Sequence, residues 1–173
     1  MRGTTRGSPP RVSFEEILWS WVGAFLGIAV VAWVSHLYFE GLDRSLMIGS
    51  FGASAVLVYG AVRSPLAQPR NLIGGHVLSA IVGVLCWKFL SENIWLAESA
   101  AVATSIAVMH ATRTLHPPGG ATALIAVIGS PGIHKLGFLY VIFPATIGPL
   151  ILLAVALLVN NIPASRRYPE IWF

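Results

Sequence analysis

The sequence predicts an all-α protein that crosses a membrane several times, as a polytopic transmembrane bundle of about six helices, some short or re-entrant. Hydrophobic residues make up 55% of the 173 residues, charged residues make up only 10%, and the mean hydropathy is +0.75. Soluble domains carry roughly 25% charged residues. The apolar residues also fall into stretches near the length of about 20 residues that crosses a bilayer.

The predicted helices follow the apolar stretches, which lie at residues 17–38, 46–62, 72–90, 96–112, 119–133 and 136–160. The first, third and last have a comfortable spanning length, and the second and fourth are marginal. The fifth is short and bounded by Gly and Pro, so it either spans or re-enters. We expect a disordered cytoplasmic tail over 1–14, a transmembrane domain over 15–162 and a cytoplasmic C-terminal tail over 163–173.

The basic residues favour six spans with both termini in the cytoplasm. With a cytoplasmic N-terminus, the residues inside are Arg2, Arg6, Arg11, Arg63, Arg70, Arg113, Arg166 and Arg167. Only Arg44, Lys88 and Lys135 then lie outside. This distribution follows the positive-inside rule. A re-entrant fifth stretch would move Arg166 and Arg167 to the outer side, which the rule disfavours.

Acidic residues are missing from the predicted membrane interior. None of the seven occurs between residues 44 and 91 or between 99 and 169. A pathway for cations or protons normally needs an intramembrane carboxylate, so the composition favours a small anion. We find no metal-ligand spacing, catalytic triad or nucleotide-binding motif. The sequence therefore predicts no enzyme activity, no cofactor and no metal, and its net charge of +4 reflects membrane orientation rather than nucleic-acid binding.

The most informative motif is the run over residues 113–123, where two prolines and two glycines separate apolar stretches. Such a run ends one helix, fixes a turn and begins another. Exposed amide groups and the positive end of the helix dipole at that start suit a small anion. We predict that the substrate-binding residues here are Arg113, His116, Pro117, Pro118, Gly119, Gly120 and Thr122. The alternative that the glycines only serve close helix packing remains open.

Two further groups extend the predicted site. Serines and glycines early in the second stretch offer hydroxyl and backbone donors near the middle of the membrane, and the third stretch begins with a second Gly-Gly-His run. These groups contribute Ser50, Gly52, Ser54, Asn71, Gly75 and His76. A weak internal repeat relates residues 58–63 to 108–113, each followed by a Pro-containing turn. A true repeat would form two related helical hairpins, a common construction around transporter sites.

Residues 116–124 (His-Pro-Pro-Gly-Gly-Ala-Thr-Ala-Leu) resemble the signature of the HPP family of integral membrane proteins. Residues 50–55 and 64–76 are similar to its other two characteristic segments, and the similarity covers roughly residues 15–162. The resemblance implies a four-helix membrane protein with a transporter role, and it implies nitrite as substrate, because plastid and cyanobacterial relatives are associated with nitrite transport. With no long transit peptide or appended soluble domain, the chain is similar to bacterial inner-membrane members.

The sequence thus favours a transporter of a small monovalent anion, most simply nitrite, that binds the anion at helix N-termini around the His-Pro-Pro-Gly-Gly turn. Transport is passive or proton-coupled. We expect the protein in the cell inner membrane, surrounded by the lipid bilayer. We also expect a homo-oligomer, because six short helices are few to enclose a pathway. A non-transporting scaffold or regulatory subunit and an anion channel are the alternatives.

Overall fold

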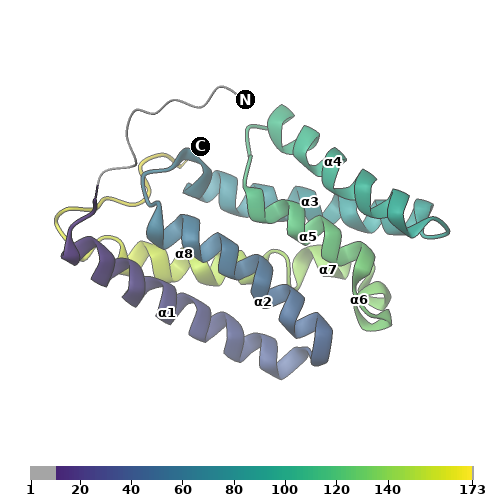
Figure 1. Cartoon of the computed structure of the whole chain (residues 1–173), viewed down its shortest axis with the longest axis horizontal. Helices are drawn as coiled ribbons and strands as arrows, with labels where there is room; N and C mark the ends of the chain where they lie inside the picture. Colours follow the sequence, from purple (N-terminus) through teal and green to yellow (C-terminus); the bar gives the residue numbers. More distant parts are fainter. Residues whose placement is uncertain (1–10, 173) are drawn as a thin grey trace.

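The computed structural model describes residues 11–172, and all regular structure within them is helical. Figure 1 shows an elongated bundle with α1 along one edge and α4 along the opposite edge. The helices are α1 (Phe14–Tyr38), α2 (Gly41–Ala55), α3 (Pro69–Leu90), α4 (Ile94–Ala111), α5 (Pro117–Ile128), α6 (Pro131–Leu136), α7 (Leu139–Ile142) and α8 (Ile147–Val159). A π-helical turn, η1 (Val56–Gly60), continues α2, and a 3₁₀ turn, η2 (Pro65–Ala67), precedes α3.

This architecture confirms a polytopic helical membrane bundle. Within the described residues, four segments are long and apolar enough to cross a membrane, namely α1, α3, α4 and the α7–α8 segment Leu139–Val159. The second and fifth predicted stretches form shorter apolar helices, Leu46–Gly60 and Pro117–Ile128. The number of long helices matches the four of the family resemblance, and the two short helices account for the six apolar stretches.

Two details of the last stretches differ from the prediction. The fifth stretch ends as a helix at Ile128, and the residues that follow form a turn and the short helix α6. The sixth stretch is broken between α7 and α8, where Pro144 lies. Proline has no amide hydrogen to donate, so it interrupts the hydrogen bonding of a continuous helix.

Local sequence explains where the helices begin. Ser13 caps α1, since its side-chain oxygen accepts a hydrogen bond from the amide of Glu16 at 3.2 Å, a common N-terminal arrangement. Helices α3, α5 and α6 each begin with proline, at Pro69, Pro117 and Pro131. Proline suits the first helical position because the amide it lacks would have no partner within the helix.

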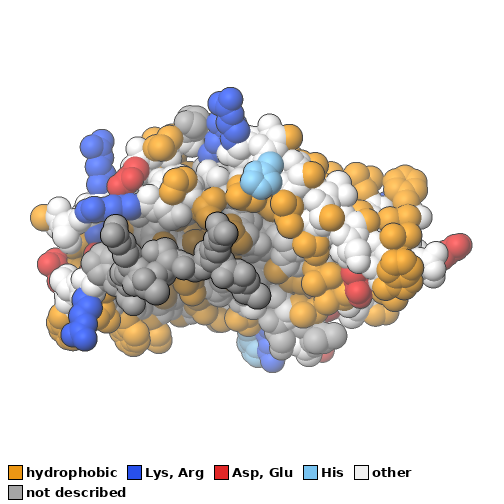
Figure 2. All heavy atoms as spheres, turned by 45° about the horizontal axis from the view of Figure 1, so that its top comes forward, with side chains coloured by type: hydrophobic (Ala, Val, Ile, Leu, Met, Phe, Trp, Pro, Cys, Tyr) orange, Lys and Arg blue, Asp and Glu red, His pale blue; other side chains and the backbone are white. Residues whose placement is uncertain are grey.

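Hydrogen bonds between distant segments place the predicted inner arginines at one end of the bundle. Arg63 donates to the carbonyl oxygen of Ser165 at 3.1 Å, and Arg70 donates to that of Thr112 at 2.8 Å. We call this the basic end; it carries Arg63, Arg70, Arg113, Arg166 and Arg167. The opposite end carries Arg44, Lys88 and Lys135. On the face shown in Figure 2, Lys and Arg side chains gather mostly in the left half.

The outer surface of the bundle is apolar. On helix α1, for example, the exposed fraction is 79% for Phe14, 62% for Trp21 and 64% for Trp33. Large exposed apolar areas are unusual on soluble monomers and mark a contact with another apolar phase. Because these side chains lie on a helix long and apolar enough to cross a membrane, the exposed surface of α1 is suited to contact with lipid.

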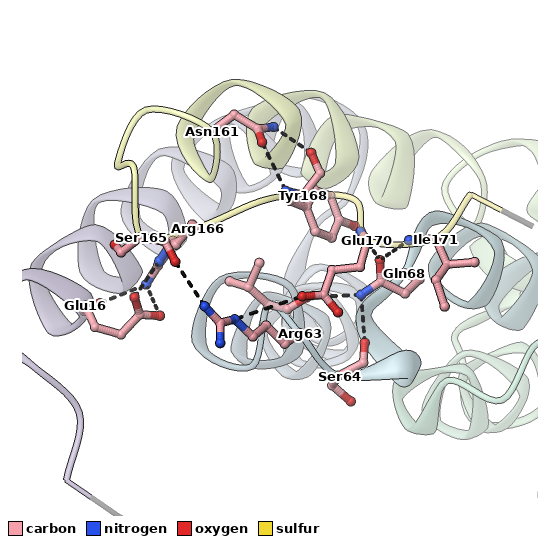
Figure 3. A network of polar contacts seen from close by, with 11 residues as sticks. Glu16, Arg63, Ser64, Gln68, Asn161, Ser165, Arg166, Tyr168, Glu170 and Ile171 are labelled. Carbon is pink, nitrogen blue, oxygen red and sulfur yellow. Dashed lines mark hydrogen bonds and ion pairs between the residues drawn. The ribbon is translucent and has the colours of Figure 1, made fainter.

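The segment predicted as a C-terminal tail folds back over the basic end (Figure 3). Buried Arg166 pairs with the carboxylate of Glu16 at 2.7 Å and donates to the hydroxyl of Ser20 at 2.7 Å. The hydroxyl of Tyr168 donates to the carbonyl oxygen of Ala67 at 2.8 Å. Burial raises the pKa of the Tyr168 phenol. Residues 1–10 of the predicted N-terminal tail, and residue 173, lie outside the described residues.

Candidate functional site

The site begins with the close approach of α3 and α5. A Cβ added to Gly119 would lie 2.8 Å from the carbonyl oxygen of Gly75 and 2.8 Å from the Oγ of Ser79. A Cβ added to Gly75 would lie 2.5 Å from the Cβ of His116. No side chain fits at such distances, so these glycines allow the two helices to touch backbone to backbone.

Helix α5 begins part-way along α3 rather than level with its first residue. The extended segment after α4 runs inward along α3, where Asn71 donates to the carbonyl oxygen of Leu115 at 2.9 Å and Gly75 contacts His116. Gly75 lies six residues beyond the start of α3 at Pro69, which is about 9 Å at the helical rise of 1.5 Å per residue. Such irregular backbone is tolerated at membrane depth where protein surrounds it and satisfies its polar groups.

Five buried polar side chains meet where α2, α3 and α5 converge. The members of this histidine–hydroxyl network are Ser50, Ser54, His76, His116 and Thr122, with exposures between 0% and 3%. Ser54 Oγ lies 2.8 Å from His76 Nε2 and 2.9 Å from His116 Nε2. Thr122 Oγ1 lies 2.6 Å from His76 Nδ1 and 3.0 Å from Ser50 Oγ. Each of the three segments that resemble the HPP family therefore contributes to one network.

One backbone acceptor fixes the direction of these hydrogen bonds. His116 Nδ1 lies 2.8 Å from the carbonyl oxygen of Leu66, which only accepts, so Nδ1 carries the hydrogen. Nε2 of the neutral ring then accepts from Ser54, and Ser54 in turn accepts from His76 Nε2. Neutral His76 is left with Nδ1 as an acceptor for the hydroxyl of Thr122. These tautomers are assigned from the bonding pattern. They leave the hydroxyls of Ser54 and Thr122 no hydrogen for their longer contacts, at 3.4 Å, with the carbonyl oxygens of Ser50 and Pro118.

The surroundings favour neutral rings. In the described part of the chain, no carboxylate contacts either imidazole. The buried carboxylate is that of Asp43, at the opposite end, where it accepts from the amide of Ser130 at 2.9 Å. Burying a charge without a partner is costly. An extra proton or an anion would therefore change the electrostatics of the network strongly.

The other predicted site residues lie apart from the network. Arg113 is exposed in the turn after α4, with a φ of 57°. Pro117 is exposed, Gly120 is half-buried with Val102 at 3.9 Å, and Gly52 has open space where a Cβ would lie. Their roles in binding stay predictions.

The N-terminus of α5 offers few free amides in this state. Pro117 and Pro118 have no amide hydrogen, and the amide of Gly119 already donates to the carbonyl oxygen of His116 at 2.8 Å. Gly119 and Pro118 are also buried. Binding of an anion by these amides stays a prediction, and it requires the turn to open.

Two partners of the network were not predicted as site residues. The carbonyl of Leu66 comes from η2, inside the second segment that resembles the family, but nothing in the sequence distinguishes it from its neighbours. The hydroxyl of Tyr140 on α7 donates to the carbonyl oxygen of Thr122 at 2.9 Å. In the sequence, Tyr140 lies within the sixth apolar stretch, and no local pattern indicates that it is buried against α5.

Each end of the bundle carries a cationic cavity. A cavity of about 400 Å³ at the basic end is lined in part by Arg63, Arg166 and Arg167. A pocket of about 270 Å³ at the opposite end, which we call the lysine pocket, is lined in part by Lys88 and Lys135. In the sequence, these lysines indicate only the orientation of the chain in the membrane. Their convergence could not be seen without the fold of α6.

The lysine pocket continues toward the network. Its lining includes His134, whose ring stacks on Trp87 with centroids 3.6 Å apart. It also includes Tyr140, which bonds to the backbone of Thr122. Among the residues that the structure describes, no acidic one lines this pocket.

The fold and the network together define a polytopic helical membrane protein with a buried polar centre. The family model described as HPP, transmembrane region, matches residues 9–169, and the chain belongs to this family. The family resemblance drawn from the sequence motifs is therefore confirmed.

Curated relatives support the same assignment. A transmembrane protein of Dictyostelium discoideum is 44% identical over 169 residues, which cover 96% of this chain and 54% of the relative. A second transmembrane protein of that organism is 46% identical over 170 residues, covering 95% of this chain and 59% of the relative. The chain thus spans little more than half the length of these relatives. No solved structure matches it.

Proposed function

We propose that this chain is a membrane transporter of a small monovalent anion, with nitrite as the first substrate to test. The observation that carries the proposal is the histidine–hydroxyl network, built from the three family-like segments and placed between two cationic ends. The anion passes between the lysine pocket and the basic end. The basic end faces the cytoplasm of a cell whose inner membrane holds the protein.

The charges of the described residues support an anion rather than a cation. The acidic side chains with contacts, such as Asp43, Glu16 and Glu170, lie at the two ends of the bundle. Cation pathways normally need a carboxylate at membrane depth. Clefts lined by positive charge raise the local concentration of anions and speed their association.

The network supplies groups that suit a small anion. Hydroxyl and imidazole groups donate hydrogen bonds, and a protonated imidazole adds charge to them. In the closed state these donors are already hydrogen-bonded, so the anion displaces the contacts of Ser50 with Thr122 and with the carbonyl oxygen of Pro118. The amides at the start of α5 become available when the turn over Pro118 opens, and the helix dipole then favours a negative ligand.

The test is uptake of ¹⁵N-labelled nitrite by liposomes that contain the purified protein. His116→Ala removes a network member and is expected to abolish uptake above the background of protein-free liposomes. His110→Ala is the matched control, because His110 is exposed on α4 and hydrogen-bonds to no described side chain. His116→Asn serves as a second variant if the alanine variant does not fold, since its amide can still donate to Leu66.

The outcome also separates this proposal from its alternatives. Folded wild-type protein that moves none of nitrite, nitrate, formate and chloride would overturn the transporter and leave the scaffold or regulatory subunit. Saturable exchange would favour a carrier, whereas flux that stays linear with concentration would favour a channel. Chemical cross-linking in the same membranes tests the expected homo-oligomer.

A further inference from the structure

We propose that Ser54 is the central link of a proton relay that moves one proton across the bundle with each transported anion. This inference rests on the proposed function, since the anion balances the charge of the proton. The supporting geometry is a continuous chain of hydrogen bonds that runs from the hydroxyl of Thr122 to the carbonyl oxygen of Leu66. The hydrogen-bond distances are 2.6 Å from Thr122 to His76 and 2.8 Å from His76 to Ser54. They are 2.9 Å from Ser54 to His116 and 2.8 Å from His116 to Leu66.

Each step of the relay exchanges one proton for another. A proton arriving at Thr122 Oγ1 displaces the hydroxyl proton onto His76 Nδ1, and His76 releases its Nε2 proton to the Oγ of Ser54. The original hydroxyl proton of Ser54 passes to His116 Nε2, and His116 releases its Nδ1 proton. The acceptor there is a water molecule or the anion at the basic end. All four side chains end neutral, so the net change is one proton moved.

The carbonyl of Leu66 gives the relay a direction. In the resting tautomers, His116 Nδ1 already holds a hydrogen, so no proton can enter there. Protons therefore enter at Thr122, on the side of the lysine pocket, because Tyr140 lines that pocket and bonds to the backbone of Thr122. After one transfer, Nδ1 of His116 no longer carries a hydrogen and faces the carbonyl oxygen of Leu66. Both atoms are then hydrogen-bond acceptors, so they repel each other. This repulsion favours the resting tautomers. Each ring regains its resting tautomer without reversing the transfer when it loses one proton to water and gains one from the same water while the site is open, which leaves the number of protons moved unchanged.

No other charged group contacts the two rings in the part of the chain that the structure describes. The surrounding elements carry these further titratable or cationic groups: Asp43 and Arg44 on α2, Tyr59 in η1, Arg70, Cys86 and Lys88 on α3, Glu98 and His110 on α4, and Tyr140 on α7. Helices α5 and α8 carry none. Asp43 and Lys88 lie at the opposite end, Arg70 lies at the basic end, and His110 is exposed. The proton that enters at Thr122 is thus the one charge that the network receives, because no neighbouring charged side chain among the described residues contacts the two rings.

The structure offers a matched pair of variants. Ser54→Ala removes the hydroxyl that joins the two imidazoles. Ser79→Ala removes a hydroxyl that is equally buried, at 0% exposure, on a helix that lines the network. Among the described residues, the oxygen of this hydroxyl has no hydrogen-bond partner. Both variants make the same chemical change in a similar environment. We expect Ser79→Ala to behave as wild type.

Two readouts from the same liposomes separate the relay from the proposed function. Exchange of labelled nitrite at equal pH on both sides reports anion transport. A pH-sensitive dye inside the vesicles reports proton movement, with protein-free liposomes correcting for diffusion of nitrous acid. We expect one proton for each nitrite in wild type. We expect Ser54→Ala to slow proton movement about 100-fold, the lower end of what a positioned proton-transfer group contributes.

Each result decides one or both proposals. Nitrite exchange without proton movement overturns the relay and leaves the transporter. Proton movement that Ser54→Ala abolishes, without nitrite exchange, supports the relay and overturns the transporter. The absence of both overturns both. Proton movement in Ser54→Ala at the wild-type rate also overturns the relay.

The tautomers provide a test that needs no transport. Nitrogen-15 NMR of the ¹⁵N-histidine-labelled protein in lipid distinguishes a ring protonated on Nδ1 from one protonated on Nε2. We expect Nδ1–H for His116 and Nε2–H for His76 in wild type and in Ser79→Ala. The opposite tautomers, or two doubly protonated rings at neutral pH, would overturn the direction of the relay.

Discussion

Arg166 and Glu16, 150 positions apart in the chain, join the C-terminal segment to the first helix through an ion pair at 2.7 Å and a second contact at 2.9 Å. The side chain of Arg166 is 2% exposed, and its guanidinium group also donates to the side-chain oxygen of Asn160 at 3.1 Å. The last helix, the C-terminal segment and α1 are therefore held together at one buried cation.

Replacing this cation will destabilise the bundle. Arg166→Ala removes the partner of the Glu16 carboxylate and one donor to the side-chain oxygen of Asn160, and breaking a buried ion pair costs about 3 kcal/mol. We expect that loss in the free energy of unfolding, measured by denaturant titration in mixed micelles. Arg167→Ala is the control, because Arg167 is exposed, and it should change stability by less than about 0.5 kcal/mol. Equal losses in the two variants would contradict the role of the buried pair.

The two adjacent glycines of the His-Pro-Pro-Gly-Gly turn differ sharply in their surroundings. Gly119→Ala places a methyl group 2.8 Å from backbone and side-chain oxygens, whereas Gly120→Ala meets Val102 at an ordinary 3.9 Å. Overpacking costs about 1–3 kcal/mol, so Gly119→Ala should lower thermal stability and abolish nitrite uptake. Gly120→Ala should keep the stability of the wild type. Similar melting temperatures for the two variants would show that α3 and α5 are not in backbone contact.

Neutralising the lysine pocket will weaken anion entry. In Lys88→Ala/Lys135→Ala, we expect the apparent KM for nitrite to rise about tenfold at low salt, the lower end of the effect of focused charge on association. Added salt should shrink the difference, because screening weakens the attraction in wild type. Arg44→Ala is the control at the same end, since Arg44 bonds to His36 and does not line the pocket. A change in KM that salt does not affect would indicate a steric effect instead.

The orientation of the chain is open to direct labelling. With Cys86 replaced by serine, Arg113→Cys and Lys135→Cys each provide a single exposed thiol, at the basic and opposite ends. We expect an impermeant maleimide added to intact cells to label the thiol at position 135 and to label that at position 113 only after lysis. The reverse pattern would place the basic end outside and contradict the positive-inside assignment.

The sequence located the helices well because apolar length and helix-starting prolines are local properties. All six apolar stretches contain helix, and Pro117 begins a helix as expected, whereas α3 begins at Pro69, three residues before the predicted stretch. The break before α8 was missed because Pro144 stands inside an otherwise uniform apolar run. The return of the C-terminal segment was missed because it depends on one side chain, Arg166, reaching a helix at the other end of the chain.

The site could be predicted as a set of residues but not as a geometry. Polar residues such as Ser54, His76 and His116 stand out because their neighbours are apolar or glycine. Their mutual distances depend on how far α5 is inset along α3, and composition does not encode that register. The sequence also suggested open amides at the start of α5, whereas the structure shows a closed turn with Gly119 bonded to His116.

The burial of the network implies that the rate of transport depends strongly on temperature. With His76, His116 and Ser54 at 0% exposure, no ion reaches them unless helices first separate, and such collective motions take microseconds to milliseconds. Turnover should then slow steeply on cooling and stop in gel-phase lipid, while a water-filled pore would conduct almost as well in the cold.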